Sequence, residues 1–228
     1  MSAGRQSHED FVRKHTALET PPLLPELRLH LASEVVPLWQ ATENELAEMG
    51  LPPPYWAFAW AGGQGLARHL LDSPETVRGK RVLDFASGSG VVAIAASLAG
   101  AAEVAASEID PYALAAIRLN AALNGCDVAV TAENQVGRNG GWDVVLAGDV
   151  CYEKPMAEAV FAWLSELARC GATVLLGDPG RTYLPKQGLE KLGRYAVQTT
   201  RELEDSDLRN AIIWRVTGEA SSVATESR

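Results

Sequence analysis

The chain has 228 residues, of which 47% are hydrophobic and 21% are charged, a balance typical of a globular protein with a sizeable core. Its net charge of −9 argues against a nucleic-acid partner, because binding a phosphate backbone requires clustered Lys and Arg. The three cysteines form no C-x-x-C pair and the four histidines are isolated in sequence, so neither a metal site nor a disulfide framework is expected.

The same sequence gives no sign of a membrane or secretory protein. Its apolar stretches stay below the roughly 18 residues that span a bilayer. The N-terminal segment MSAGRQSHEDFVRKH lacks the apolar centre of a signal peptide, and Glu9 and Asp10 argue against a transit peptide. We therefore expect a cytoplasmic protein of enzyme size that has no membrane partner. We also expect a monomer.

The first 50 residues contain few clear elements. Residues 7–18 fit a short helix, and ELRLHLA at 26–32 alternates like a strand. Thr42 followed by Glu45 is a capping-box pattern that predicts a helix as far as Met49. Only residues 1–6 and 219–228, at the two ends of the chain, are expected to be disordered.

An aromatic, proline-rich stretch precedes the regular part of the chain. In PPPYWAFAW at 52–60, the prolines fix φ and remove backbone donors, which predicts a stiff, ordered segment rather than a strand. GGQ at 62–64 then leads into a helix over LARHLLD. We expect the glycines to lie before the helix.

From Lys80 onward, apolar strands alternate with helices. This alternation predicts a mostly parallel sheet with helices on both faces. The last two strands are joined by the short polar turn EDSD, which fits an antiparallel hairpin. The expected strands are 81–85, 103–107, 127–130, 142–148, 172–177, 195–203 and 208–217, and the expected helices are 91–100, 111–125 and 154–171.

A loop of small residues connects the first of these strands to its helix, in VLDFASGSG at 82–90. Such a loop lets backbone N–H groups and a helix N-terminus approach a ligand closely. Ala86, Gly88 and Gly90 stand at alternate positions, and the third glycine of the dinucleotide fingerprint G-x-G-x-x-G is missing. A turn that only packs the helix onto the strand is the alternative interpretation.

A carboxylate ends the second strand. Glu108 lies 24 residues after Asp84, where an acidic side chain can accept both ribose hydroxyls of a bound nucleoside. Asp110 precedes Pro111 and suits a helix start through its charge. Glu108 is therefore the predicted ligand, and a solvated strand end is the alternative.

The segment VLAGDVCY at 145–152 ends a predicted core strand in a carboxylate and a phenol. Because the fourth strand lies beside the first in this topology, Asp149 should reach the carboxyl edge of the sheet, where open α/β sheets bind ligands. Tyr152 follows three positions later. For Tyr152, an exposed aromatic at a helix start is the alternative.

These motifs together resemble the class I, seven-strand protein-lysine methyltransferases, which use S-adenosyl-L-methionine. The loop after Asp84 is similar to their D-x-G-x-G-x-G loop, with Ala86 in the place of the first glycine. WAGGQGLARHLL at 60–71 is similar to their W-x-x-G-x-x-L-x-x-x-L segment, although Ala61 replaces a usual proline. Asp149 and Tyr152 match the spacing of their D-x-x-Y motif.

Three segments narrow the resemblance to members of this family that act on lysines of the electron transfer flavoprotein β-subunit. They are PYWAFAWAGGQGLARHLLD, LAGDVCYE and LLGDPGR. The resemblance implies a Rossmann-like α/β fold with a seven-stranded, mostly parallel sheet, an antiparallel C-terminal hairpin, and helices on both faces. We expect an N-terminal extension over 1–50, the methyltransferase domain over 51–218 and a disordered tail over 219–228.

The resemblance also implies the cofactor site. The small-residue loop would wrap the methionine end of S-adenosyl-L-methionine, and Trp60 would pack near the cofactor. Gly148 would let the cofactor approach the end of the strand. Asn134, with Glu133 as the alternative, would contact the adenine. The residues implied to bind the cofactor are Trp60, Asp84, Ala86, Ser87, Gly88, Gly90, Glu108, Asn134 and Gly148.

Asp149 and Tyr152 are the implied catalytic pair. A lysine must lose a proton before it attacks, at a cost of roughly 4–5 kcal/mol at pH 7. The positive sulfur of the cofactor favours that loss, whereas Asp149 would aim the amine and stabilise the cationic nitrogen formed during transfer. Tyr152 would shape the channel and orient the amine or Asp149. Asp178 and Arg181 are candidate contacts to the substrate, although GDPGR also fits a plain turn.

Other functions stay open. The same fold methylates lysines of ribosomal or other basic proteins, and a small-molecule N-methyltransferase is a further alternative. A nicotinamide-dependent oxidoreductase lacks support, because the third glycine and a Tyr-x-x-x-Lys pair are missing. A binding module without activity would not require Glu108, Asp149 and Tyr152 together.

Overall fold

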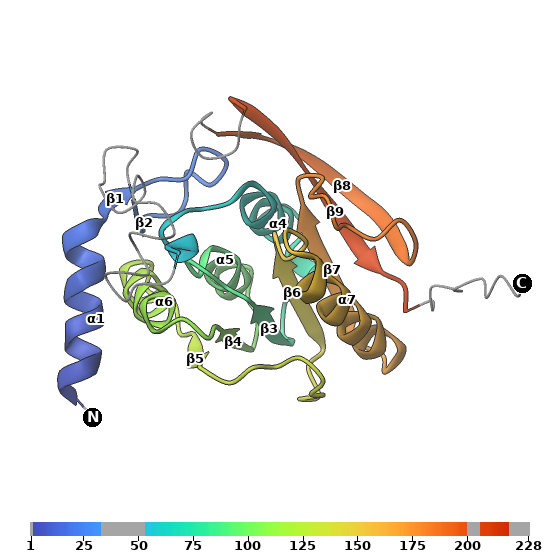
Figure 1. The fold of residues 1–228 in the computed structure, drawn as a ribbon, viewed down its shortest axis with the longest axis horizontal. Coiled ribbons are helices and arrows are strands. Elements are labelled where there is room, and N and C mark those ends of the chain that lie inside the picture. Colours follow the sequence, from blue (N-terminus) through green and yellow to red (C-terminus); the bar gives the residue numbers. More distant parts are fainter. Residues whose placement is uncertain (1, 33–52, 200–205, 219–228) are drawn as a thin grey trace, which may run out of the picture.

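The computed structural model describes residues 2–32, 53–199 and 206–218, and its centre is a seven-stranded sheet (Figure 1). The strands are β3 (Arg81–Phe85), β4 (Glu103–Ser107), β5 (Ala129–Thr131), β6 (Val144–Gly148), β7 (Thr173–Asp178), β8 (Leu189–Gln198) and β9 (Leu208–Val216). Their order is β5-β4-β3-β6-β7-β9-β8, with β3, β4, β5, β6 and β7 parallel and β9 antiparallel to both its neighbours. The predicted mostly parallel sheet with a C-terminal hairpin is confirmed.

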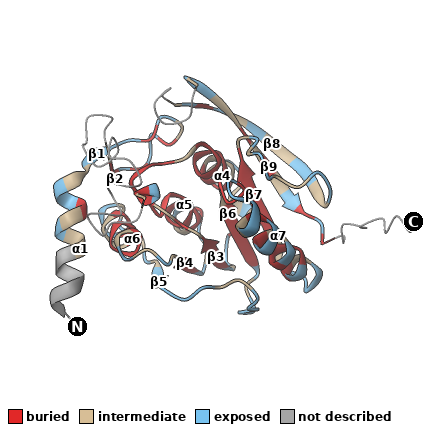
Figure 2. Cartoon of the chain, in the orientation of Figure 1, coloured by how far each residue is buried: buried red, intermediate tan, exposed pale blue. Residues whose placement is uncertain are grey.

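Helices cover both faces of this sheet. On one face lie α4 (Ala61–Asp72), α5 (Val91–Leu98) and α6 (Pro111–Leu123), and α7 (Lys154–Arg169) lies on the other (Figure 1). Alternate residues of β3 pack against the helices on opposite faces of the sheet. Val82 packs with the α4–α6 layer, and Leu83 packs with α7. The central strands β3, β6 and β7 are therefore buried on both sides, as Figure 2 shows.

The glycines of GGQ lie inside a helix, contrary to expectation. Helix α4 begins at Ala61, directly after the 3-10 helix Tyr55–Ala57 and the short extended segment that follows it. A Cβ added to Gly62 would lie only 2.4 Å from the carbonyl oxygen of Gly177 on β7. Tertiary packing against the sheet thus outweighs the low helix propensity of glycine.

The N-terminal residues also differ in part from the prediction. Helix α1 spans Ser2–His15, so residues 2–6 are helical and not disordered. Packing of Phe11 against Tyr112 of α6, with ring centroids 4.7 Å apart, anchors the second half of α1, and the helix extends from that anchor. Short strands β1 (Ala17–Glu19) and β2 (Leu29–Leu31) pair antiparallel within the expected region. The helix expected up to Met49 and the tail 219–228 lie outside the described residues.

The first strand of the C-terminal hairpin lies earlier in the chain than predicted, at Leu189–Gln198 instead of 195–203. A register shift between Lys191 and Gly193 interrupts the pairing of this strand, β8, with β9. This irregularity breaks the simple alternation on which the prediction relied. Within the described part of the chain, the helices are too short or too polar to cross a bilayer.

Candidate active site

The parallel strands bring the predicted motifs to one edge of the sheet. The loops that follow β3, β4, β6 and β7 carry the small-residue loop, Glu108, Asp149 with Tyr152, and the GDPGR turn. Because the carboxyl ends of parallel strands meet at this edge, four segments far apart in sequence become neighbours.

The small-residue loop has the tight backbone that its sequence predicts. Ala86, Gly88 and Gly90 have φ values of 52°, 55° and 83°, in the left-handed region that favours glycine. A Cβ added to Gly88 would meet its nearest neighbour, the Cα of Trp56, only at 4.0 Å, which leaves room above the loop. Gly90 instead packs against Ile117 of α6.

Asp84 and Ser87 support this loop from below. The Oδ2 atom of Asp84 accepts hydrogen bonds from the Ser87 hydroxyl and from the Ala93 amide, the latter at 3.0 Å. Asp84 is 1% exposed, and burial raises its pKa to about 7. The predicted cofactor contact of Asp84 is therefore wrong, because its carboxylate holds the loop onto α5. The Ser87 hydroxyl is likewise used internally, which leaves the Ser87 backbone for ligand contact.

Glu108 is brought to the loop, as expected. Its Oε1 accepts from the Gly88 amide at 3.1 Å and its Oε2 from the Ile109 amide at 2.9 Å. Burial raises the pKa of Glu108, and these hydrogen bonds oppose that rise. A half-buried carboxylate beside an open glycine loop fits the ribose of a nucleoside cofactor, since a carboxylate offers about four acceptor directions and its backbone partners, Gly88, Ile109 and Asp110, do not use all of them.

The loop after β5 lies beside this carboxylate but makes its own turn. The Asn134 Oδ1 accepts from the Val136 amide at 3.0 Å, and the Glu133 carbonyl accepts from the Ser107 hydroxyl at 3.1 Å. Asn134 and Glu133 are both exposed. Contact of either residue with adenine stays a prediction.

Asp149 is held firmly at the end of β6. Its φ is 57°, an uncommon conformation for a residue other than glycine. Its Oδ2 accepts from the Gly63 amide at 3.1 Å, and its Oδ1 accepts from Arg181 Nε at 3.0 Å and Nη2 at 2.7 Å. Both partners were missed from the sequence: Gly63 was expected outside the helix, and Arg181 was expected to contact the substrate.

Gly148 has a packing role that was not predicted. A Cβ at Gly148 would lie 2.9 Å from the Cα of Gly63, and one at Gly62 would lie 2.5 Å from Oδ2 of Asp149. The missing side chain thus admits helix α4 to the end of the strand, and the approach of the cofactor to Gly148 stays a prediction. This close approach is what lets the first turn of α4 donate to Asp149.

Aromatic side chains line the rim above Asp149. Trp60 Nε1 donates to the Tyr55 carbonyl at 2.8 Å, and the ring of Trp60 lies 5.6 Å from the guanidinium carbon of Arg181. Tyr152 is 44% exposed, and its ring centroid is 5.5 Å from that of Tyr55. Burial, first among several causes, raises the pKa of Tyr152 to about 12, so its hydroxyl keeps its proton near neutral pH. Tyr55 was not predicted, although it belongs to the aromatic stretch that was noticed.

Asp178 is not available to a substrate, which corrects the prediction. It is 0% exposed, and its Oδ1 accepts from the backbone amides of Gly180 and Arg181 at 2.6 and 2.7 Å. Burial raises its pKa. Asp178 therefore shapes the turn that presents Arg181.

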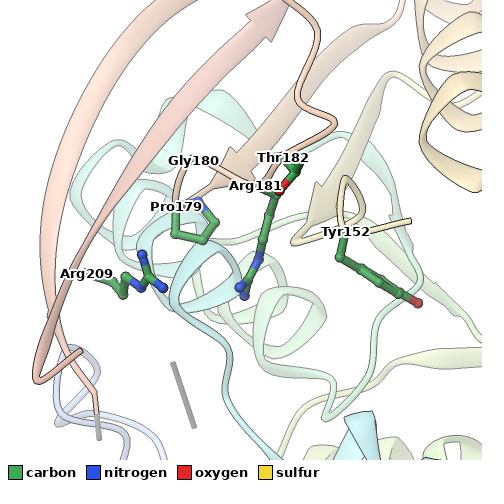
Figure 3. Close-up of a pocket in the computed structure, with 6 residues that line it drawn as sticks. All are labelled: Tyr152, Pro179, Gly180, Arg181, Thr182 and Arg209. Carbon is green, nitrogen blue, oxygen red and sulfur yellow. The ribbon is translucent and has the colours of Figure 1, made fainter. Parts of the chain in front are cut away.

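This turn borders an open pocket of about 410 Å³. Figure 3 shows Arg181 pointing between Tyr152 on one side and Arg209 of β9 on the other. Arg209 was not predicted, because nothing in its local sequence marks it. The lining residues are Tyr152, Pro179, Gly180, Arg181, Thr182 and Arg209.

Comparison with known proteins places these features in a family. The family model described as "Ribosomal protein L11 methyltransferase (PrmA)" matches residues 68–151. The "Electron transfer flavoprotein beta subunit lysine methyltransferase" of Xenopus laevis is 39% identical over 90% of this chain and 85% of its own length. The human protein of the same description is 37% identical over 90% of this chain and 80% of its own length.

Solved structures share the fold. Magnesium protoporphyrin IX methyltransferase from Synechocystis PCC 6803, solved with bound SAM, matches with a TM-score of 0.51 at 17% identity. The match covers 68% of this chain and 79% of that one.

Proposed function

The chain belongs to the family of electron transfer flavoprotein β-subunit lysine methyltransferases, and we propose on this basis that it methylates lysine side chains of that subunit. The reaction is transfer of a methyl group from S-adenosyl-L-methionine to a lysine nitrogen. The geometric observation that carries the proposal is the Asp149 carboxylate, fixed at the same sheet edge as the glycine loop and Glu108.

The cofactor site consists of the loop after β3 and the end of β4. Glu108 would accept from the ribose hydroxyls, and the loop from Ala86 to Gly90 would surround the amino-acid end. When bound, the cofactor supplies a methyl group on a positively charged sulfur. Trp60, at the start of α4, would close the site on the side of Asp149.

The chain's own chemistry at the lysine is positioning and charge stabilisation. Asp149 would aim the amine and stabilise the nitrogen as it becomes cationic. Tyr152 would donate its hydroxyl hydrogen bond without titrating, because its pKa is raised to about 12. The monomeric state, the cytoplasmic location, and the absence of nucleic-acid and membrane partners stay predictions.

A ribosomal protein is the second candidate substrate. The match to the ribosomal protein L11 methyltransferase model favours it, but this match is restricted to residues 68–151. That segment contains β3 to β6 and the cofactor loop, and it ends before Tyr152 and the GDPGR turn. The shared part therefore contains the cofactor loop, Glu108 and Asp149, but not Tyr152 or Arg181.

Mass spectrometry of candidate substrates tests the proposal. Purified enzyme and cofactor are incubated in parallel with electron transfer flavoprotein and with ribosomal protein L11. We expect methylated lysines in the flavoprotein β-subunit. Methylation of L11 alone, or of neither protein, would contradict the assignment.

The matched inactive variant is Asp149→Asn, since Asn tolerates a left-handed φ and has nearly the same size. Loss of the carboxylate charge should lower turnover by roughly 100-fold or more. Affinity for S-adenosyl-L-homocysteine, measured by calorimetry, should change only several-fold. Asp127→Asn, on an exposed loop, is the control and should keep wild-type turnover.

A further inference from the structure

Arg181 occupies a defined place on the carboxylate assigned to the reaction. Two of its nitrogens, Nε and Nη2, converge on Oδ1 of Asp149 at 3.0 and 2.7 Å. Its side chain is 20% exposed and that of Asp149 is 9% exposed, so water screens this ion pair only in part. Such a pair differs from a surface salt bridge, which contributes little.

The rest of the site holds Arg181 in this position. Asp178 fixes its backbone by accepting from the Arg181 amide at 2.7 Å. The guanidinium lies over the ring of Trp60 at 5.6 Å, within the range of a cation–π contact. Three contacts from different elements thus fix one cation beside Asp149.

The placement resolves a conflict in the chemistry of the proposed reaction. An uncompensated carboxylate beside an amine stabilises the protonated form and so opposes the proton loss that must precede attack. A guanidinium on the same carboxylate cancels much of that effect. Resting on the proposed function, we propose that Arg181 is a positioning residue that offsets part of the negative charge of Asp149, so that the target lysine is oriented without being held as an ammonium ion.

The other ionisable groups near this pair do not replace Arg181. Burial, with the charges of Asp178 and Asp149, raises the pKa of Cys151 to about 12, so this thiol stays neutral, as the Tyr152 hydroxyl does. Arg209 adds a second cation at the pocket. The first turn of α4 carries no acidic residue. Among the described residues, the ionisable groups around the pair include Tyr55, Cys151, Tyr152, Asp178 and Arg209, with Glu108 acting on Tyr152 through its charge.

The proton and electron balance is simple. The lysine ammonium first releases its proton to water, which reaches Arg181 and Tyr152 through the open pocket. The nitrogen lone pair then forms the N–CH₃ bond, and the electron pair of the broken S–CH₃ bond stays on sulfur. Arg181 itself exchanges no proton, because its guanidinium remains charged throughout the accessible pH range.

The test is the pH dependence of the single-turnover methylation rate with saturating flavoprotein. We compare wild type with Arg181→Gln and with Arg181→Met, which keeps an apolar stem beside Trp60. In either charge-free variant, the pH at which the methylation rate rises should increase by about one unit or more. The reason is that loss of a cation raises the pKa of the bound amine. Arg181→Lys should lower the rate, but the rate should rise at the same pH as in wild type.

The control variant is Arg215→Gln, on β9, which removes an exposed ion pair with Glu190. It should leave both the methylation rate and its pH dependence unchanged. Equal rate losses at every pH in the charge-free variants would overturn the inference, since a purely structural role predicts that result. Failure of the inference about Arg181 can be told apart from failure of the proposed function. The proposed function fails only if the wild-type enzyme does not methylate the flavoprotein.

Discussion

Asp84 belongs to the small-residue loop motif, as predicted, but its side chain supports the loop and does not face the cofactor site. The carboxylate is buried at the end of β3, where it accepts from Ser87 and from the first turn of α5. Its value to the site lies in holding the small-residue loop in its left-handed turns. The cost is a carboxyl group that resists ionisation, since burial raises its pKa from 3.8 to about 7.

This shift predicts a pH-dependent stability difference between wild type and Asp84→Asn. The folded state binds the Asp84 proton more tightly than the unfolded state, so the wild-type contribution is greatest below pH 4 and is lost as pH rises towards 7. Asn accepts the same two hydrogen bonds without titrating. The free energy of unfolding of the variant, relative to wild type, should therefore increase between pH 4 and 7, by roughly 4 kcal/mol at most.

Urea denaturation of the cofactor-free proteins at several pH values measures this difference. The other carboxylates titrate in both proteins, so their contributions largely cancel in the comparison. Parallel stability curves for wild type and Asp84→Asn would show that Asp84 does not titrate in this window. Asp127→Asn, at an exposed position, should give such parallel curves.

At the scale of elements, the start of α4 decides the geometry of the site. Gly62 and Gly63 are adjacent in the same helical turn but face different surroundings. A Cβ at Gly62 would clash with the Gly177 carbonyl and lie 2.5 Å from Asp149 Oδ2, whereas one at Gly63 would meet a side-chain methyl of Val91 at 3.4 Å. Only the first contact would push the helix away from the sheet.

The two glycines therefore predict opposite results for the same substitution. Gly62→Ala should lower the free energy of unfolding by about 1–3 kcal/mol through overpacking, and it should reduce turnover because Asp149 must move. Gly63→Ala gains helix propensity and should stay within about 1 kcal/mol of wild type, or exceed it. Thermal and urea unfolding with parallel turnover assays check both. Similar effects of the two variants would contradict the close helix–sheet contact.

Elements were predicted correctly where the local sequence pattern and the tertiary packing favour the same structure. RVLDF and EVAAS were predicted at their observed limits, because apolar runs bounded by polar residues are typical of buried parallel strands. The GGQ helix start was wrong because glycine's low propensity is overruled by packing that no local pattern reveals. The pairing of Asp149 with Arg181, 32 residues apart, depends on the neighbouring positions of β6 and β7 and on the turn after β7.

At the scale of the whole molecule, the N-terminal residues pack into the same body as the sheet. Val12 of α1 is fully buried in a cluster with Trp56, Ala113 and Ala116. Farther along, the His30 amide donates to Asn120 of α6 at 2.6 Å. The division at residue 50 into an extension and a catalytic domain stays a prediction, and these contacts favour a single cooperative unit.

Val12→Ala tests that view. Removing two buried carbons should lower the free energy of unfolding by about 2 kcal/mol, because the transfer term is joined by a cavity term. If α1 unfolds together with the sheet, circular dichroism and tryptophan fluorescence should report one coincident urea transition, shifted to lower denaturant. Lys14→Ala, on the exposed face of the same helix, should leave the transition in place. An unshifted transition for Val12→Ala, or an earlier separate loss of helix, would instead mark α1 as an independent extension.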